Sequence, residues 1–347
     1  MKNFTYQLNL LFFVLFFFFS AFLWGNTNSQ NHHQENQKDN LNHLFLMQPL
    51  KTKNQFPFYL PFLFMPMEQA APSSFQGFEL KTGIYLASTF LDPYACNLKG
   101  EFDAETYYLF FEGGYTFSNG IQLRGLLGFI ILGPGFLDAV IENFHHALKL
   151  PNGGREAGPS NRFLLTWKDG DAFFKDQKAI NGFSDPAFFV KIPLWGQNPF
   201  FALSGGIKIP FSSKNWVRSG TFDLGLTLHF EYYANRFYLY SSFGSVFMLG
   251  DSFYKKELHF EKPYSIHGGL GIGFRVSKKV SLFNQFYIQT SPYKIGVKRI
   301  DNPSVVHSFG VRWQVKKDFL LQITADEDTF TYAMADIAFL VQGEIRF

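Results

Sequence analysis

Apolar and polar residues alternate with a period of two along most of the chain from residue 78 onward. Residues 222–232 (FDLGLTLHFEY) and residues 264–275 (YSIHGGLGIGFR) place nearly all of their apolar side chains on one face. Period two held over about ten residues predicts β-strands, and these are longer than most strands of soluble proteins. Their length suits a tilted strand that crosses a bilayer.

Turn-like residues divide this pattern into strands and connections. The candidate strands are residues 78–90, 106–117, 121–132, 186–195, 199–209, 221–233, 236–249, 264–276, 279–290, 304–315, 318–326 and 335–347. Links of about two residues, such as Asn119-Gly120, alternate with longer ones, of which 133–185 is the longest. Short periplasmic turns and long extracellular loops alternate in this way in outer-membrane barrels, and with an even number of strands both termini are expected on the periplasmic side.

The last predicted strand alternates up to a terminal phenylalanine. Residues 335–347 end in Gly343, Ile345 and Phe347, which is similar to the C-terminal assembly signal of bacterial outer-membrane barrels. We therefore predict an all-β fold, an antiparallel transmembrane β-barrel of about twelve strands in a Gram-negative outer membrane. The expected partners are outer-membrane lipids and, through the strand ending at Phe347, the barrel-assembly machinery. A soluble β-sandwich also alternates, but it needs neither the order of loops nor the terminal phenylalanine.

Three segments precede the barrel, which we expect to cover residues 78–347. Residues 1–25 contain Lys2, then an apolar run and then small residues, which is the pattern of a cleaved signal peptide. An uncleaved anchor is the other interpretation, although the run is short for a membrane span. Residues 26–43 are polar and predict a disordered linker. Residues 44–77 contain prolines that disfavour a central strand or helix, and they predict a plug or a periplasmic segment.

Composition narrows the classes of function. Aromatic residues make up 20% of the chain, including 47 Phe and 16 Tyr, which can supply lipid-facing bulk and interfacial girdles. The net charge is +3 and the basic residues are scattered, so we expect no nucleic-acid partner. One cysteine forbids an internal disulfide. Because zinc-type cysteine sets, phosphate loops and Gly-x-Ser-x-Gly elbows are lacking, we predict no catalytic residue, no metal and no cofactor.

The long loop 133–185 is the first candidate for function, because loops of this length are usually functional or disordered. Residues 135–150 predict an amphipathic helix followed by turn residues. If it folds into the lumen it acts as a gate, and the candidate gate residues are Asp138, Glu142, His145, His146, Asn152 and Arg155. Glu142 and His145 have a spacing that suits a metal, but we favour a solvated polar face because a sound site needs more ligands.

The inward face of the predicted barrel is the second candidate. Its lumen-lining candidates are Glu112, Arg124, Lys208, Asp223, His229, Glu231, His267 and Arg275. Mixed charge lines a solute path or forms a salt-bridged filling, and twelve strands lie between filled and open barrels. Gly269, Gly271 and Gly273 share this face and permit close approach by the 135–150 helix or by the proline-rich segment.

Two segments carry a resemblance to a known family. Residues 49–57 (PLKTKNQFP) and residues 135–155, which end in LPNGGR, are similar to an uncharacterised bacterial family, the domain of unknown function DUF3187. Phe56 stands where a polar residue is expected. The resemblance implies an exported, barrel-like protein and assigns no activity to any residue.

Three functions remain open at this stage. The first is a passive, porin-like pore or transporter for small solutes, hydrophobic ones included, gated by the 133–185 loop. The second is an outer-membrane enzyme that modifies lipid, with His145, His146 or His229 as the base beside a serine or an activated water. The third is a structural or surface-binding barrel with a filled lumen.

Overall fold

The computed structural model describes the part of the chain that forms the barrel and its interior. The described residues are 45–73, 75–91, 102–148, 161–167, 171–175, 179–211, 216–251, 262–294, 298–328 and 334–347. The predicted signal peptide and polar linker lie outside them. None of the helices within these ranges is long and apolar enough to cross a membrane.

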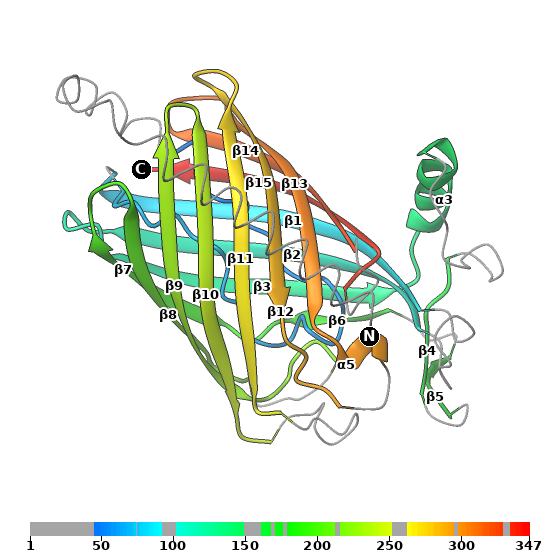
Figure 1. Cartoon of the computed structure of the whole chain (residues 1–347). Helices are drawn as coiled ribbons and strands as arrows, with labels where there is room; N and C mark the ends of the chain where they lie inside the picture. Colours follow the sequence, from blue (N-terminus) through cyan, green and yellow to red (C-terminus); the bar gives the residue numbers. More distant parts are fainter. Residues whose placement is uncertain are drawn as a thin grey trace, which may run out of the picture. The chain divides into compact units, whose positions relative to one another are not determined.

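Twelve antiparallel strands close into a barrel (Figure 1). They are β1 (Gly77–Leu91), β2 (Phe102–Thr116), β3 (Gln122–Gly133), β7 (Ala187–Trp195), β8 (Phe200–Lys208), β9 (Phe222–Ala234), β10 (Phe237–Leu249), β11 (Tyr264–Arg275), β12 (Val280–Gln289), β13 (Ser304–Gln314), β14 (Phe319–Glu327) and β15 (Ile337–Arg346). Each pairs with the next in this order, and β1 pairs with β15 from Glu79↔Arg346 to Ser88↔Ile337. The predicted all-β barrel is confirmed, and the largest error in a boundary is at the start of β2.

The long connection between β3 and β7 adds small elements at one end of the barrel. It contains the helix α3 (Leu137–Leu148) and the strands β4 (Leu164–Trp167), β5 (Asp171–Lys175) and β6 (Ile180–Phe183). β4 pairs with β2 and β5, so it extends the sheet beside the barrel wall and is not one of the twelve strands that close the barrel. A short helix, α5 (Lys298–Asp301), lies between β12 and β13.

One wall position is discontinuous. β6 and β7 both pair with β3, and residues 184–186 interrupt them. The Ser184 amide still donates to the Gly128 carbonyl at 2.8 Å, while the Ser184 hydroxyl accepts from the Gly128 amide at 3.1 Å. The side chain thus replaces a strand partner at the break, and it leaves Ser184 and Asp185 available to the interior.

The two faces of the wall have opposite chemistry. On β9, Leu226 and Leu228 are 54% and 45% exposed, whereas Asp223 and Glu231 on the other face are fully buried. A soluble protein would bury the leucines and expose the carboxylates. The inverted arrangement is the one a barrel needs when lipid surrounds it and its interior is polar.

Residues 45–73, which we call the luminal segment, lie inside the barrel (Figure 1). Phe45 packs beside Leu320 at the end with the short turns, and Pro72 returns to the same end beside Gly120. Between them the chain reaches the long-loop end and turns there, where the Tyr59 amide donates to the Phe56 carbonyl at 2.9 Å. The interior is therefore crossed twice by one hairpin-like excursion.

The membrane-facing assignment of the outer surface can be tested with charge. We expect Leu228→Arg, at the middle of β9, to lower the free energy of unfolding by about 2–4 kcal/mol, because the guanidinium meets the bilayer midplane. Phe237→Arg, beside a short turn and 58% exposed, is the matched control and should cost about 0–1 kcal/mol. Urea unfolding in liposomes measures both. Equal costs at the two positions would contradict a membrane-spanning β9.

Candidate functional site

Arg312 on β13 holds the first limb of the luminal segment. Its Nη1 donates to the carbonyl oxygens of Gln48 and Pro49 at 3.1 and 3.3 Å, and its Nη2 donates to the Glu344 carboxylate at 3.0 Å. The Arg312 side chain is 2% exposed. A buried guanidinium needs a counterion and several acceptors, and here the wall supplies the charge while the luminal segment supplies the carbonyl oxygens.

Two ion pairs join the luminal segment to the wall in the half of the barrel nearer the short turns. Lys51 pairs with Glu112 on β2, and Glu68 on the returning limb pairs with Arg124 on β3. Glu112 also lies 3.5 Å from Arg124 and 3.8 Å from Lys81, so one carboxylate faces three cations. The mixed charge of the lumen face is thus arranged as a network that includes the luminal segment.

Wall side chains also form hydrogen bonds with backbone amides and carbonyl oxygens of the luminal segment, which pairs with no strand. The amides of Leu63 and Ala71 donate to Asp223 at 2.8 Å and to Glu231 at 2.9 Å. Lys191 donates to the Gln69 carbonyl at 2.8 Å. Buried backbone donors and acceptors must be paired, so these contacts fix the segment in place.

Glycines in the wall make room for the methionines of the luminal segment. A Cβ atom at Gly269 would collide with the Met67 sulfur, and one at Gly273 would lie 3.0 Å from the Met47 methyl carbon. A Cβ atom at Gly225 on β9 would likewise collide with the Met65 sulfur. Of the two elements proposed to approach the β11 glycines, the proline-rich segment is the one that does so.

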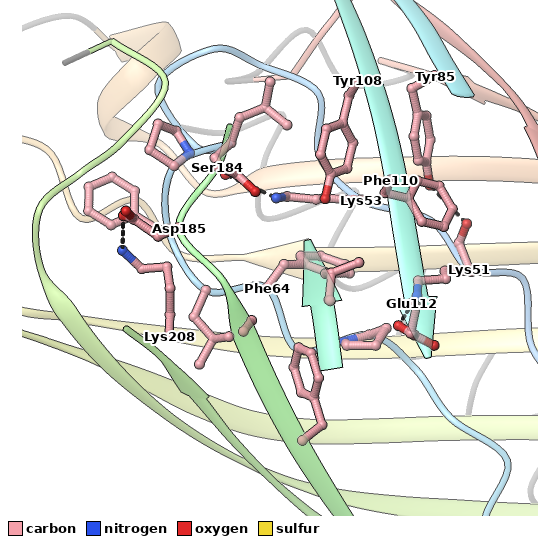
Figure 2. A pocket seen from close by; sticks show the side chains of 18 of the residues that line it. Lys51, Lys53, Phe64, Tyr85, Tyr108, Phe110, Glu112, Ser184, Asp185 and Lys208 are labelled. Carbon is pink, nitrogen blue, oxygen red and sulfur yellow. Dashed lines mark hydrogen bonds and ion pairs between the residues drawn. The ribbon is translucent and has the colours of Figure 1, made fainter. Parts of the chain in front are cut away.

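Two cavities remain between the luminal segment and one side of the wall. The first lies toward the long-loop end against β1, β2, β3, β7 and β8 (Figure 2). The second lies toward the short-turn end among Gln48, Glu79, Arg124 and Arg312. Lys51, Pro66 and Glu112 line both cavities, so the two follow each other along the barrel and meet at the Lys51–Glu112 ion pair.

The first cavity combines aromatic rings with ammonium groups. Lys51 lies 5.1 Å from the ring centroid of Phe110, and Lys53 lies 4.9 Å from that of Tyr108. Lys208 is held at the far side by Asp185, at 3.1 Å (Figure 2). Cations over ring faces are attracted to the π electrons, which stabilises charge in an apolar surrounding.

The residues predicted to line the lumen occupy four regions of it. Glu112 and Arg124 belong to the ion-pair network around Lys51, while Lys208, which bonds Asp185, lies 3.3 Å from Asp223. His229, Glu231 and His267 are buried along the returning limb, and His267 bonds Thr227 at 2.9 Å. Arg275 is half-buried at the end of β11.

Several residues of the site were not among the sequence candidates. Arg312 and Glu344 stand on the polar positions of alternating strands, so the period-two pattern was a sufficient signal for them. Lys53 belongs to the luminal segment, whose prolines give no periodicity to read. Asp185 lies in the break between β6 and β7, which resembles loop sequence.

The loop candidates lie away from these cavities. Leu137 and Ile141 of α3 pack against Ile337, with Leu86 and Phe339 beside them, on the outward face of β1 and β15. Asp138 accepts a hydrogen bond from the Asn161 amide at 2.7 Å. The remaining candidates are the half-buried Glu142, the exposed His146, His145, whose side chain is not described, and Asn152 and Arg155, which lie outside the described residues.

The structure places a serine beside one histidine of the enzyme hypothesis. His229 Nε2 lies 3.0 Å from the Ser204 hydroxyl, and the Glu68 amide donates to His229 Nδ1 at 3.4 Å. With Nδ1 as acceptor, the ring proton is on Nε2, so the imidazole donates to Ser204 and is not poised to take its proton. Both side chains are fully buried, which disfavours a catalytic role. Within the described ranges, no three His, Cys, Asp or Glu residues group as a metal site.

A family model matches residues 36–347, and its description is a protein of unknown function, DUF3187. The chain belongs to the DUF3187 family. The match spans the luminal segment and the whole barrel. A search of curated protein sequences gives no match.

Solved structures resemble this DUF3187 protein in fold. The COG4313 outer membrane channel of Pseudomonas putida F1 has a TM-score of 0.50 and 8% identity, covering 80% of this chain and 100% of that one. The translocator domain of the autotransporter NalP from Neisseria meningitidis has 0.45 and 9%, with coverages of 79% and 90%. The P. putida toluene transporter TodX has 0.39 and 9%, with 78% and 90%. The first of these supports the outer-membrane type of barrel.

The fit of the luminal segment against the glycines can be tested in neighbouring residues of β11. Gly269→Val should push Met67 away and loosen the returning limb, because the added side chain points into the lumen. Gly268→Val is the matched control, since a Cβ there meets only the Ser242 carbonyl oxygen at 3.4 Å and a Phe243 ring carbon at 3.9 Å.

The measurement is the rate at which a cysteine at Ala70, which is fully buried, reacts with a water-soluble maleimide in a Cys96→Ser background of this DUF3187 protein. We expect faster labelling with Gly269→Val and no change with Gly268→Val. Equal rates in both variants would mean that the luminal segment does not depend on this contact.

Proposed function

We propose that the protein is an outer-membrane channel for small solutes, closed in this conformation by the luminal segment. The observation that carries the proposal is the pair of cavities in series along one side of the wall, which meet at the Lys51–Glu112 ion pair. A solute that follows this side would have one constriction to pass. The proposal includes export by a cleaved signal peptide and assembly in the outer membrane through the C-terminal strand.

The constriction contains the Lys51 side chain, and hydrogen bonds hold the Lys51 backbone in place. The Lys51 amide and carbonyl bond the Gln322 side chain at 3.4 and 3.3 Å, and the Tyr85 hydroxyl donates to the same carbonyl at 2.8 Å. The ammonium group alone reaches across to Glu112. A change of the Lys51 rotamer would withdraw one of the three residues that line both cavities, while the rest of the luminal segment keeps its contacts.

The luminal segment is a better candidate for the closing element than the 133–185 loop. The described part of that loop packs α3 on the outward face of the wall, whereas both cavities are bounded by residues 48–69. A barrel with a permanently filled lumen is the competing function, and the buried ion-pair network favours it. A measurement of conductance distinguishes a channel from a barrel with a permanently filled lumen.

Removal of the constriction should raise conductance. We expect Lys51→Ala to increase the single-channel conductance of the purified protein in planar bilayers severalfold, because the side chain no longer crosses the path. Glu112 keeps Arg124 and Lys81 as partners, so the variant leaves no unpaired carboxylate. Lys316→Ala in the exposed turn between β13 and β14 is the control and should behave as the unmodified protein.

Two deletions complete this experiment. Deletion of residues 137–148 should leave the conductance unchanged, and deletion of residues 46–71 should give the largest conductance. A barrel that stays electrically silent in Lys51→Ala and also without residues 46–71 would overturn the channel and leave the structural role.

A further inference from the structure

Lys53 is a cation without a carboxylate partner among the described residues. Its ammonium donates to the Leu60 carbonyl at 2.9 Å and lies over the Tyr108 ring. The other two lysines of the first cavity are each paired, Lys51 with Glu112 and Lys208 with Asp185. A neutral carbonyl and a ring face compensate an ammonium less well than a carboxylate does, so Lys53 keeps the capacity to bind an anion.

The charge of the lining agrees with a single negative charge in the cavity. Three ammonium groups, Lys51, Lys53 and Lys208, line it together with two carboxylates, Glu112 and Asp185, and among the described residues Lys53 is the one of the three lysines with no carboxylate at ion-pair distance. A cation would meet this unpaired ammonium, whereas a single anionic group would give Lys53 the carboxylate partner that it lacks.

The shape and polarity of the wall suit a planar apolar body. The rings of Tyr85 and Tyr108 stack at 6.1 Å with an interplanar angle of 21°, and Phe110 lies 5.8 Å from Tyr108 and 6.2 Å from Tyr85, so the three rings form a compact aromatic cluster. Phe62 and Leu63 of the luminal segment also line the cavity. Figure 2 shows Lys51 and Lys53 on the same side as these rings. A flat ring can pack against this aromatic cluster while an attached anionic group reaches Lys53.

We infer that the first cavity binds a monoanionic carboxylate with a planar apolar body, and that Lys53 is the residue that holds the carboxylate. The site names the solute class of the proposed channel, and in that sense it rests on the proposed function. Lys53 donates to the ligand carboxylate while keeping the Leu60 carbonyl, since an ammonium has three donors.

The test is isothermal titration of the full chain in detergent with benzoate and with benzamide, its neutral counterpart. Benzoate should bind saturably, and benzamide about tenfold more weakly or worse, because the charge-assisted hydrogen bond is lost. Lys53→Gln retains a donor for the Leu60 carbonyl but removes the charge, and it should weaken benzoate about tenfold while leaving benzamide unchanged. Lys53→Arg should restore the preference, and Lys316→Gln is the control for a lost surface charge.

The assignment of Lys53 is wrong if benzoate binds Lys53→Gln as tightly as the unmodified chain, and the anionic class is wrong if benzamide binds as tightly as benzoate. The absence of any benzoate binding also overturns the site. These results are distinct from those of the channel. Conductance without benzoate binding removes the solute class and leaves the channel, whereas Lys53-dependent binding in a silent barrel leaves a binding site and removes the channel. Heat-dependent migration in gels confirms that each variant is folded.

Discussion

The structure depends on one requirement, which is that a chain inside a barrel must have its backbone polar groups satisfied by side chains. The wall strands exhaust their own amides and carbonyls on each other, so the luminal segment finds no strand partner. Asp223 and Glu231 accept its amide protons, while Arg312, Lys191 and tyrosine hydroxyls such as that of Tyr287 donate to its carbonyl oxygens. The polar interior of this barrel is therefore explained first by what fills it.

Buried ion pairs fix the position of the luminal segment more than they stabilise the folded protein. The desolvation of two charges offsets much of their attraction, but the loss of one partner leaves an uncompensated charge and costs about 3–5 kcal/mol. The Glu68–Arg124 pair thus fixes the returning limb against β3. Arg312, whose charge Glu344 compensates, fixes the first limb against β13 through the carbonyl oxygens of Gln48 and Pro49. The glycines complete this fit, because an alanine at Gly269 would already displace Met67.

The sequence predicts the wall well and the interior poorly, for a physical reason. Alternation reports which side of a strand faces lipid, and it therefore located the twelve strands and the polar face that carries Glu112 and His229. The luminal segment is held by contacts between residues more than a hundred positions apart, such as Leu63 with Asp223, and no local pattern encodes them. The amphipathic pattern of α3 likewise predicts a buried face without saying what covers it, and Leu137 packs outside the wall.

The distribution of contacts also constrains how the barrel can open. Expulsion of the whole luminal segment would leave Arg312, Asp223 and Glu231 facing an emptied lumen, and its backbone groups would all need new partners at once. Water in a widened lumen can hydrate these groups, but every contact must break before the path gains anything. Movement of the Lys51 side chain breaks one ion pair whose carboxylate keeps two other cations nearby. Local opening beside a retained luminal segment is therefore the less costly route, and it preserves the cavity in which Lys53 would meet a solute.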